Sequence, residues 1–218
     1  MGRGIGVCCI LLGILCLLGG AGLVVHNRWE ANEAGKISQS MLQEVQEQIL
    51  KNEEITEETE IIDTEESTGN TEVTGTEEVA DEPSREMVTI PVEGYECIGI
   101  LSIPAIGLEW PILTDWDYVK LKKAPCLYYG NYYEPDFVIA AHYYPTHFGG
   151  LSKLQAGDVV LFTNINGETY SYEVVLLETL PKKATKEMIA SGFDLTLYTC
   201  TADGVNRVTV RCRKIQDM

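Results

Sequence analysis

The sequence lacks features that would place it in several common classes of protein. It holds 16 Lys and Arg against 33 Asp and Glu, a formal net charge of −17, so it has no basic excess of the kind that nucleic-acid binding requires. None of its 7 cysteines forms a Cys-x-x-Cys pair, the usual signature of a structural zinc site. We therefore expect no nucleic-acid partner and no metal.

Charged residues are missing from the run Gly4–Val25 near the start of the chain. A membrane-spanning helix needs about 20 mostly apolar residues, whereas the apolar core of a cleaved signal peptide has about 7–15. The length favours a retained anchor, residues 1–28, although the small residues 19–21 resemble a cleavage region. Because Arg3 precedes the run and acidic residues follow it, we predict a single-pass protein of the cell membrane with a cytoplasmic N-terminus and an extracellular domain.

Aromatic residues are absent from residues 52–86, which consist largely of Glu and Thr. Such a segment cannot bury enough apolar surface to offset the entropy lost on ordering. We predict a disordered acidic spacer over 52–88, which would hold the following domain away from the bilayer. Residues 29–51 carry apolar residues at helical spacing, and they predict a stalk helix that is either stable or only marginally formed.

Short strand-like runs follow one another over residues 89–218, and Asn166-Gly167 between two of them is a strong hairpin signal. Seven or eight short strands with Gly and Pro turns predict a mainly β domain, a closed barrel or a sandwich. Only two short helices are expected, near 117–121 and 185–191. The apolar helix and the acidic segment would precede this domain.

Cys200 ends one of these runs, and Arg207 opens the next after an Asp203-Gly204 turn. A hairpin of this kind places a thiol and a guanidinium near each other. A nearby cation favours the thiolate, and it can also hold the oxyanion of a tetrahedral intermediate. Taken alone, the two residues are equally compatible with a packed cysteine and a surface arginine.

His142 also stands at a strand end, after the apolar run 137–141. The chain has 3 histidines, and the other two lie beside the apolar N-terminal run and in the loop at position 147. Histidine can act as an acid toward a leaving amine and as a base toward an incoming nucleophile. Cys200, His142 and Arg207 together are therefore a candidate set for acyl transfer.

Five segments resemble those of sortases, the membrane-anchored cysteine transpeptidases of Gram-positive bacteria. Thr196–Cys200 matches the family signature Thr-Leu-x-Thr-Cys, and Val138–His142 resembles its strand ending in Ala-Gly-His, with Ala141 in place of Gly. The remaining similarity lies in Ile103-Pro104 with Trp110–Ile112, in Phe148–Asp158 and in Asn206–Val208. The resemblance covers residues 96–214, and it implies a sortase-like closed β-barrel of seven to eight strands with short helices.

The resemblance also implies a mechanism and partners. Cys200 would attack the Thr–Gly bond of a Leu-Pro-x-Thr-Gly-like sorting signal on a secreted protein and form a thioester. His142 would protonate the departing amine, and Arg207 would bind the oxyanion or the substrate backbone. An amine of a peptidoglycan precursor or of another protein would take the acyl group, with no cofactor. The positions that match the family's substrate groove are Ala141, Thr196, Tyr198 and Thr199.

Several alternatives remain open. Arg211 and Arg213 share a strand face with Arg207, which we favour because it lies nearest to Cys200. The absence of an Asp-Pro-aromatic lid motif and of a C-terminal apolar segment argues against a pilin-polymerising sortase, and the short segment between 177 and 195 departs from class B, so the subclass is open. A hydrolytic cysteine peptidase and a non-catalytic surface-anchored binding module are the alternative functions. An L,D-transpeptidase is disfavoured because its Ser/His-x-Gly-x-x-Cys context is absent.

Overall fold

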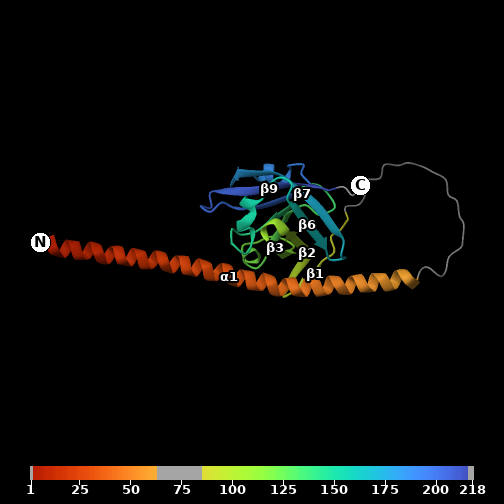
Figure 1. The fold of residues 1–218 in the computed structure, drawn as a ribbon, viewed down its shortest axis with the longest axis horizontal. Coiled ribbons are helices and arrows are strands. Elements are labelled where there is room, and N and C mark those ends of the chain that lie inside the picture. The colour runs from red at the N-terminus through yellow and green to blue at the C-terminus, as the bar shows by residue number, and fades with distance from the viewer. Residues whose placement is uncertain (1, 63–84, 216–218) are drawn as a thin grey trace.

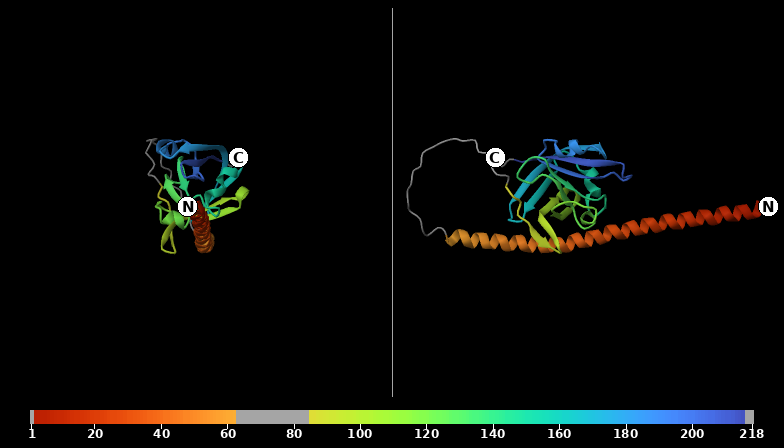
Figure 2. Two further views of the ribbon diagram at one scale, coloured as in Figure 1. Left: turned by 90° about the vertical axis from the view of Figure 1, so that its left-hand side faces the viewer. Right: turned by 180° about the vertical axis from the view of Figure 1, so that it is seen from behind.

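The computed structural model describes residues 2–62 and 85–215. One long helix, α1 (Gly2–Ile62), lies along one side of a β-barrel, and its N-terminal part projects well beyond the barrel (Figures 1 and 2). Among the described residues, α1 is the one helix that is long and apolar enough to cross a membrane by length and composition. Residues 11–25 of its apolar part are exposed, as at Leu15 and Leu18.

The predicted anchor and the predicted stalk helix form one continuous helix. α1 continues to Ile62, so residues 52–62 are helical where the composition predicted the start of a disordered spacer. Glutamate has a high helix propensity, and adding residues to an existing helix is far less costly than nucleating a new one. Residues 63–84, the central part of the predicted spacer, lie outside the described residues.

Nine strands form one mixed sheet, and eight of them close into a barrel. The order is β1-β2-β3-β4-β5-β8-β9-β7-β6, and pairing of β6 with β2 closes the ring. The short β1 lies outside the ring and pairs antiparallel with the first residues of β2. The pairs β3–β4 and β5–β8 are parallel. The strands are β1 (Ile90–Val92), β2 (Tyr95–Ile103), β3 (Leu108–Leu113), β4 (Cys126–Tyr129), β5 (Phe137–Ala140), β6 (Val159–Asn164), β7 (Thr169–Pro181), β8 (Leu195–Cys200) and β9 (Asn206–Lys214).

The helices of the barrel domain are short. The two expected ones are present as η3 (Lys120–Lys122), a 3-10 turn, and α2 (Thr185–Ile189), and two further 3-10 helices, η2 (Pro104–Ile106) and η4 (Phe148–Lys153), were not expected. The closed barrel of seven to eight strands with short helices is therefore confirmed.

Two apolar cores hold the structure together. The first fills the barrel and is rich in aromatic side chains, including Phe137 and Phe162. The second lies between the barrel and α1, which contributes Met41, Val45 and Ile49 at a spacing of four residues, so that they form one stripe on the helix. Full burial of each such side chain contributes about 1.5–3 kcal/mol. The helix is thus part of the folded domain.

This packing changes the expected role of the acidic segment. The contacts of α1 with the barrel begin directly after its apolar part, at Glu30, whose carboxylate lies 2.7 Å from Lys122 Nζ. They continue to Asn52, whose amide donates a hydrogen bond of 3.1 Å to Ile165 O. Because α1 itself docks on the barrel, the distance between the apolar part and the barrel is set by the helix and not by the segment that follows it.

Candidate active site

Strand pairing explains how residues distant in sequence come together. β5 and β8 are parallel neighbours, with Ala140 opposite Tyr198, so their C-terminal ends meet at the same edge of the barrel. His142 follows the end of β5, and Cys200 is the last residue of β8. β9 runs antiparallel to β8 with Arg207 directly opposite Cys200. Three adjacent strands therefore supply the three candidate residues.

A tight hairpin fixes the register between Cys200 and Arg207. Thr201 N donates to Asn206 O at 3.0 Å, and Gly204 N donates to Thr201 O at 2.8 Å. Gly204 has φ 72°, a left-handed conformation that glycine adopts without steric cost. Asp203 Oδ1 accepts hydrogen bonds from Thr201 Oγ1 at 2.5 Å and from Val205 N at 3.0 Å.

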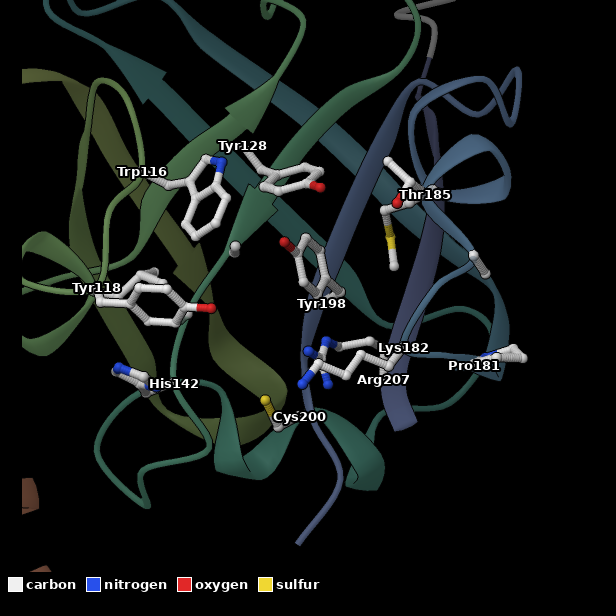
Figure 3. A pocket seen from close by; sticks show the side chains of 15 residues that line it. Trp116, Tyr118, Tyr128, His142, Pro181, Lys182, Thr185, Tyr198, Cys200 and Arg207 are labelled. Atoms are coloured by element: carbon white, nitrogen blue, oxygen red, sulfur yellow. The ribbon is translucent and has the colours of Figure 1, made fainter. Parts of the chain in front are cut away.

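Cys200, His142 and Arg207 line one cavity of about 150 Å³. Figure 3 shows the sulfur of Cys200 between the imidazole of His142 on one side and the guanidinium of Arg207 on the other. Of the four residues predicted to line a substrate groove, Ala141 and Tyr198 line this cavity.

The other two predicted groove residues, Thr196 and Thr199, do not line it. Both are buried, and their hydroxyls are used within the protein. Thr196 Oγ1 accepts a hydrogen bond from Arg211 Nη1 at 3.0 Å. Thr199 Oγ1 donates to Ala141 O at 2.8 Å, which ties β8 to the residue that precedes His142. These two threonines therefore stabilise β8 and its neighbours without lining the cavity.

The structure also separates the three candidate arginines. Arg211 is buried, with Nε 2.8 Å from Glu178 Oε1 and Nη2 2.7 Å from Glu187 O. Arg213 lies over the ring of Phe193, 4.6 Å from its centroid. Of the three, only Arg207 lines the cavity with Cys200.

Comparison with protein families matches residues 101–215, more than half of the chain, to the Sortase domain. This chain belongs to the sortase family. Sortases are cysteine transpeptidases, so the chain belongs to a family of enzymes. A search of the curated proteins finds no match.

Solved sortase structures resemble the barrel. Sortase A from Corynebacterium diphtheriae is 25% identical with a TM-score of 0.51, and the match covers 57% of this chain and 63% of that chain. Sortase C1 from Streptococcus agalactiae is 25% identical with a TM-score of 0.50, covering 56% and 69%. A Clostridium perfringens sortase D5 transpeptidase shares the fold at 19% identity, with a TM-score of 0.58 and coverage of 83% and 99%. The chain therefore spans less than two thirds of the length of the C. diphtheriae sortase A.

The sortase site has an aromatic wall that the sequence analysis missed. The ring of Trp116 lies 5.4 Å from that of Tyr128, which in turn lies 5.1 Å from Tyr198. Tyr118, 72% exposed, closes the wall on the side of His142 (Figure 3). The available signal was the pair Trp116 and Tyr118 in the turn-rich segment 114–118, because neighbouring exposed rings can form an apolar patch that marks a binding site.

His142 is held as a neutral imidazole that is ready to exchange protons. Burial lowers the pKa of His142 below its ordinary value; the nearby Glu30 carboxylate opposes this shift and Lys122 reinforces it. His142 Nε2 is buried and makes no hydrogen bond with any of the described residues.

The thiols of this sortase differ in environment. Cys97, Cys126 and Cys212 are buried, and burial raises the pKa of each of these thiols to about 12. Cys200 is partly exposed and unpaired. Among residues 2–62 and 85–215, no group of His, Cys, Asp and Glu is arranged to hold a metal ion. Among the cysteines of the barrel domain, Cys200 is therefore the candidate nucleophile.

Proposed function

We propose that this sortase is anchored in the cell membrane and cleaves a Leu-Pro-x-Thr-Gly-like sorting signal of a secreted protein through a thioester on Cys200. It transfers the acyl group to an amine of a peptidoglycan precursor or of another surface protein. The observation that carries this proposal is the position of the Cys200 sulfur between His142 and Arg207 at a single cavity (Figure 3).

The first half of the reaction releases the C-terminal part of the signal. Neutral His142 accepts the proton of the Cys200 thiol, and the resulting thiolate attacks the carbonyl carbon of the Thr–Gly bond while the guanidinium of Arg207 donates hydrogen bonds to the oxyanion. Protonated His142 gives its proton to the glycine nitrogen as the C–N bond breaks. The products are a thioester and a free amine.

The second half reverses these roles. An acceptor amine gives a proton to neutral His142 and attacks the thioester carbonyl, and Arg207 again binds the oxyanion. The C–S bond breaks, the thiolate of Cys200 leaves, and an amide joins the acyl group to the acceptor. The lowered pKa of His142 favours the neutral form, which this second half needs.

The aromatic wall favours the binding of a peptide whose N-terminal residues are apolar. Trp116, Tyr128 and Tyr198 offer ring faces beside the thiol, and ring faces bind leucine and proline side chains well. Arg207 lies in the same cavity and can hold the peptide backbone. We assign the acyl part of the sorting signal to this cavity.

The apolar part of α1 supports the proposed location. Its exposed leucines require an apolar surrounding, and the barrel docks on the same helix immediately beyond them. With the N-terminus in the cytoplasm, the active site lies outside the cell and close to the outer face of the membrane, where lipid-linked acceptors and newly secreted proteins are found.

Mass spectrometry of the full-length protein in detergent tests the proposal. A Leu-Pro-x-Thr-Gly peptide is expected to add its acyl part to the wild-type chain, with none added to C200A. With triglycine present, the released product should be the triglycine amide. Release of only the free acid with and without triglycine would identify a hydrolytic peptidase instead, and surface anchoring that survives C200A in cells would identify a binding module.

A further inference from the structure

A second and larger cavity, of about 760 Å³, reaches the same reacting groups. It shares only His142 and Cys200 with the first cavity. Its remaining walls are residues 24–32 of α1, the loop 143–146 that follows His142, and the hairpin turn 201–204. The reacting atoms of the site therefore stand between two spaces, one lined by the barrel and one lined in part by the N-terminal helix.

The helix wall of the second cavity is held in place by several contacts. Thr146 Oγ1 donates a hydrogen bond of 3.0 Å to Ala31 O of α1. Two turns further along, Ser38 Oγ lies 3.2 Å from Nε2 of the buried His147, and it also donates to Lys123 O. Each of these contacts joins α1 to the barrel domain. The position of the wall is thus set by the fold.

The proposed reaction assigns one cavity to the sorting-signal peptide and the other to the acceptor amine. His142 gives its proton to the leaving amine and later removes one from the acceptor amine, so both amines approach from the side that His142 serves. Arg207 and the rings of Trp116, Tyr128 and Tyr198 line the first cavity and not the second, and they suit the acyl part of the peptide. The space left for an amine is the second cavity.

The charges of the second cavity fit a cationic amine. Two carboxylates line it, Glu30 from α1 and Asp203 from the hairpin turn, together with one guanidinium, that of Arg28. Glu30 keeps a negative charge because its ion pair with Lys122 lowers the pKa of its carboxyl group. A primary amine arriving as an ammonium ion is attracted to these carboxylates before it loses its proton.

We propose that the second cavity receives the acceptor amine, and that the membrane-anchoring helix is therefore one wall of the sortase active site. This inference rests on the proposed function. It assigns the acceptor to the membrane-facing side of Cys200, and it makes the cavity-lining residues of the segment 24–32 part of the transfer step.

The test measures how the thioester of the full-length protein is divided between an amine and water. The partition ratio, amide formed over acid formed, is set after acylation, so a change in acylation rate does not alter it. N27W places a large ring in the cavity from an exposed position of α1. V25W, on the same helix and outside the cavity, is the matched control.

With triglycine as the probe, N27W is expected to lower the partition ratio on the order of tenfold, because the amine loses its approach to the thioester. The ratio for hydroxylamine, which needs little more room than water, should fall much less. V25W should keep the wild-type ratio with both nucleophiles.

Three other outcomes would each overturn either the assignment of this cavity to the acceptor or the proposed function. If N27W forms the thioester but keeps the wild-type triglycine ratio, the acceptor does not use this cavity. The same conclusion follows if V25W lowers the ratio as much as N27W does. If the wild-type chain forms no thioester with any sorting-signal peptide, the proposed function itself fails. E30Q paired with E33Q, a second glutamate of α1 outside the cavity, tests the charge separately: only E30Q should raise the triglycine concentration needed for half-maximal transfer.

Discussion

Gly35 of α1 lies directly against Thr146 in the loop that follows His142. A methyl group on Gly35 would stand 2.9 Å from Thr146 Cγ2, closer than such atoms approach in folded proteins. Thr146 is also fixed by its hydrogen bond to Ala31 O. The N-terminal helix and the loop that follows His142 therefore pack without room for one additional carbon atom.

G35A should consequently lower both stability and transfer. Alanine favours an exposed helix by about 1 kcal/mol over glycine, but overpacking at a tight contact costs about 1–3 kcal/mol. The expected result is a lower melting temperature and a transfer rate reduced on the order of tenfold, because the His142 loop moves. G22A, where nothing lies within 4 Å, should leave both quantities unchanged or slightly raise stability.

A second-site change shows whether the clash is the cause. T146S keeps the hydroxyl that bonds Ala31 and removes the methyl group that meets Gly35. The double variant G35A/T146S should therefore recover most of the lost transfer rate. A loss that persists in the double variant would mean that the contact between Gly35 and Thr146 does not position the loop.

The charges beside His142 should move its pKa in opposite directions. Burial lowers the pKa of His142, Glu30 acts against this shift and Lys122 adds to it. In K122M the attraction of Glu30 is unopposed, so the pKa of His142 should rise. In E30Q the repulsion of Lys122 is unopposed, so it should fall. NMR titration of the imidazole measures both shifts, and E33Q should show neither; equal values in all variants would contradict this electrostatic account.

His147 should make the protein lose stability in mild acid. Burial lowers the pKa of His147 from 6.5 to about 4, so the folded state binds its proton only near pH 4, while the unfolded state binds one near pH 6.5. Stability from this group is complete above pH 6.5 and is lost as the pH falls toward 4, by about 3 kcal/mol.

Thermal melts of the full-length protein in detergent at pH 7, 6, 5 and 4 measure this loss. H147Q removes the titrating group, so its melting temperature should fall less between pH 7 and pH 4 than that of the wild type. Parallel curves for the two proteins would show that His147 does not contribute to acid sensitivity.

Arg207 and Arg211 lie on the same strand, but substitutions at the two positions should affect different properties, kcat for Arg207 and stability for Arg211. R211M removes the cation paired with Glu178 in a largely buried position and should destabilise the fold by about 3 kcal/mol. R207K should leave the melting temperature nearly unchanged but lower kcat about a hundredfold, because an ammonium ion cannot reproduce the two-pronged contact with the oxyanion. Chemical denaturation and single-turnover acylation separate the two effects, with the exposed R213M as the neutral control.

The alternation of residues along β8 shows which side chains share a face with Cys200, but not what covers that face. Thr196, Tyr198 and Cys200 alternate along the strand and point to the same side. Tyr198 and Cys200 line the cavity, whereas Thr196 is covered by the Arg211 side chain, which in turn is held by backbone carbonyls of α2. The covering side chain belongs to the neighbouring strand β9, so the pattern of β8 alone contains no information about it.

The sequence by itself determined the mainly β domain and its sortase signature, because short alternating strands, tight turns and the residues at strand ends are local properties of the chain. It placed Cys200, His142 and Arg207 at strand termini, and parallel pairing of β5 with β8 brought them together. Only the tertiary structure decided that α1 continues past the apolar run and docks on the barrel. The apolar stripe of Met41, Val45 and Ile49 packs against a barrel surface that forms only when distant strands come together. That docking is a long-range apolar contact, and it brings α1 beside the cavity that holds Cys200 and His142.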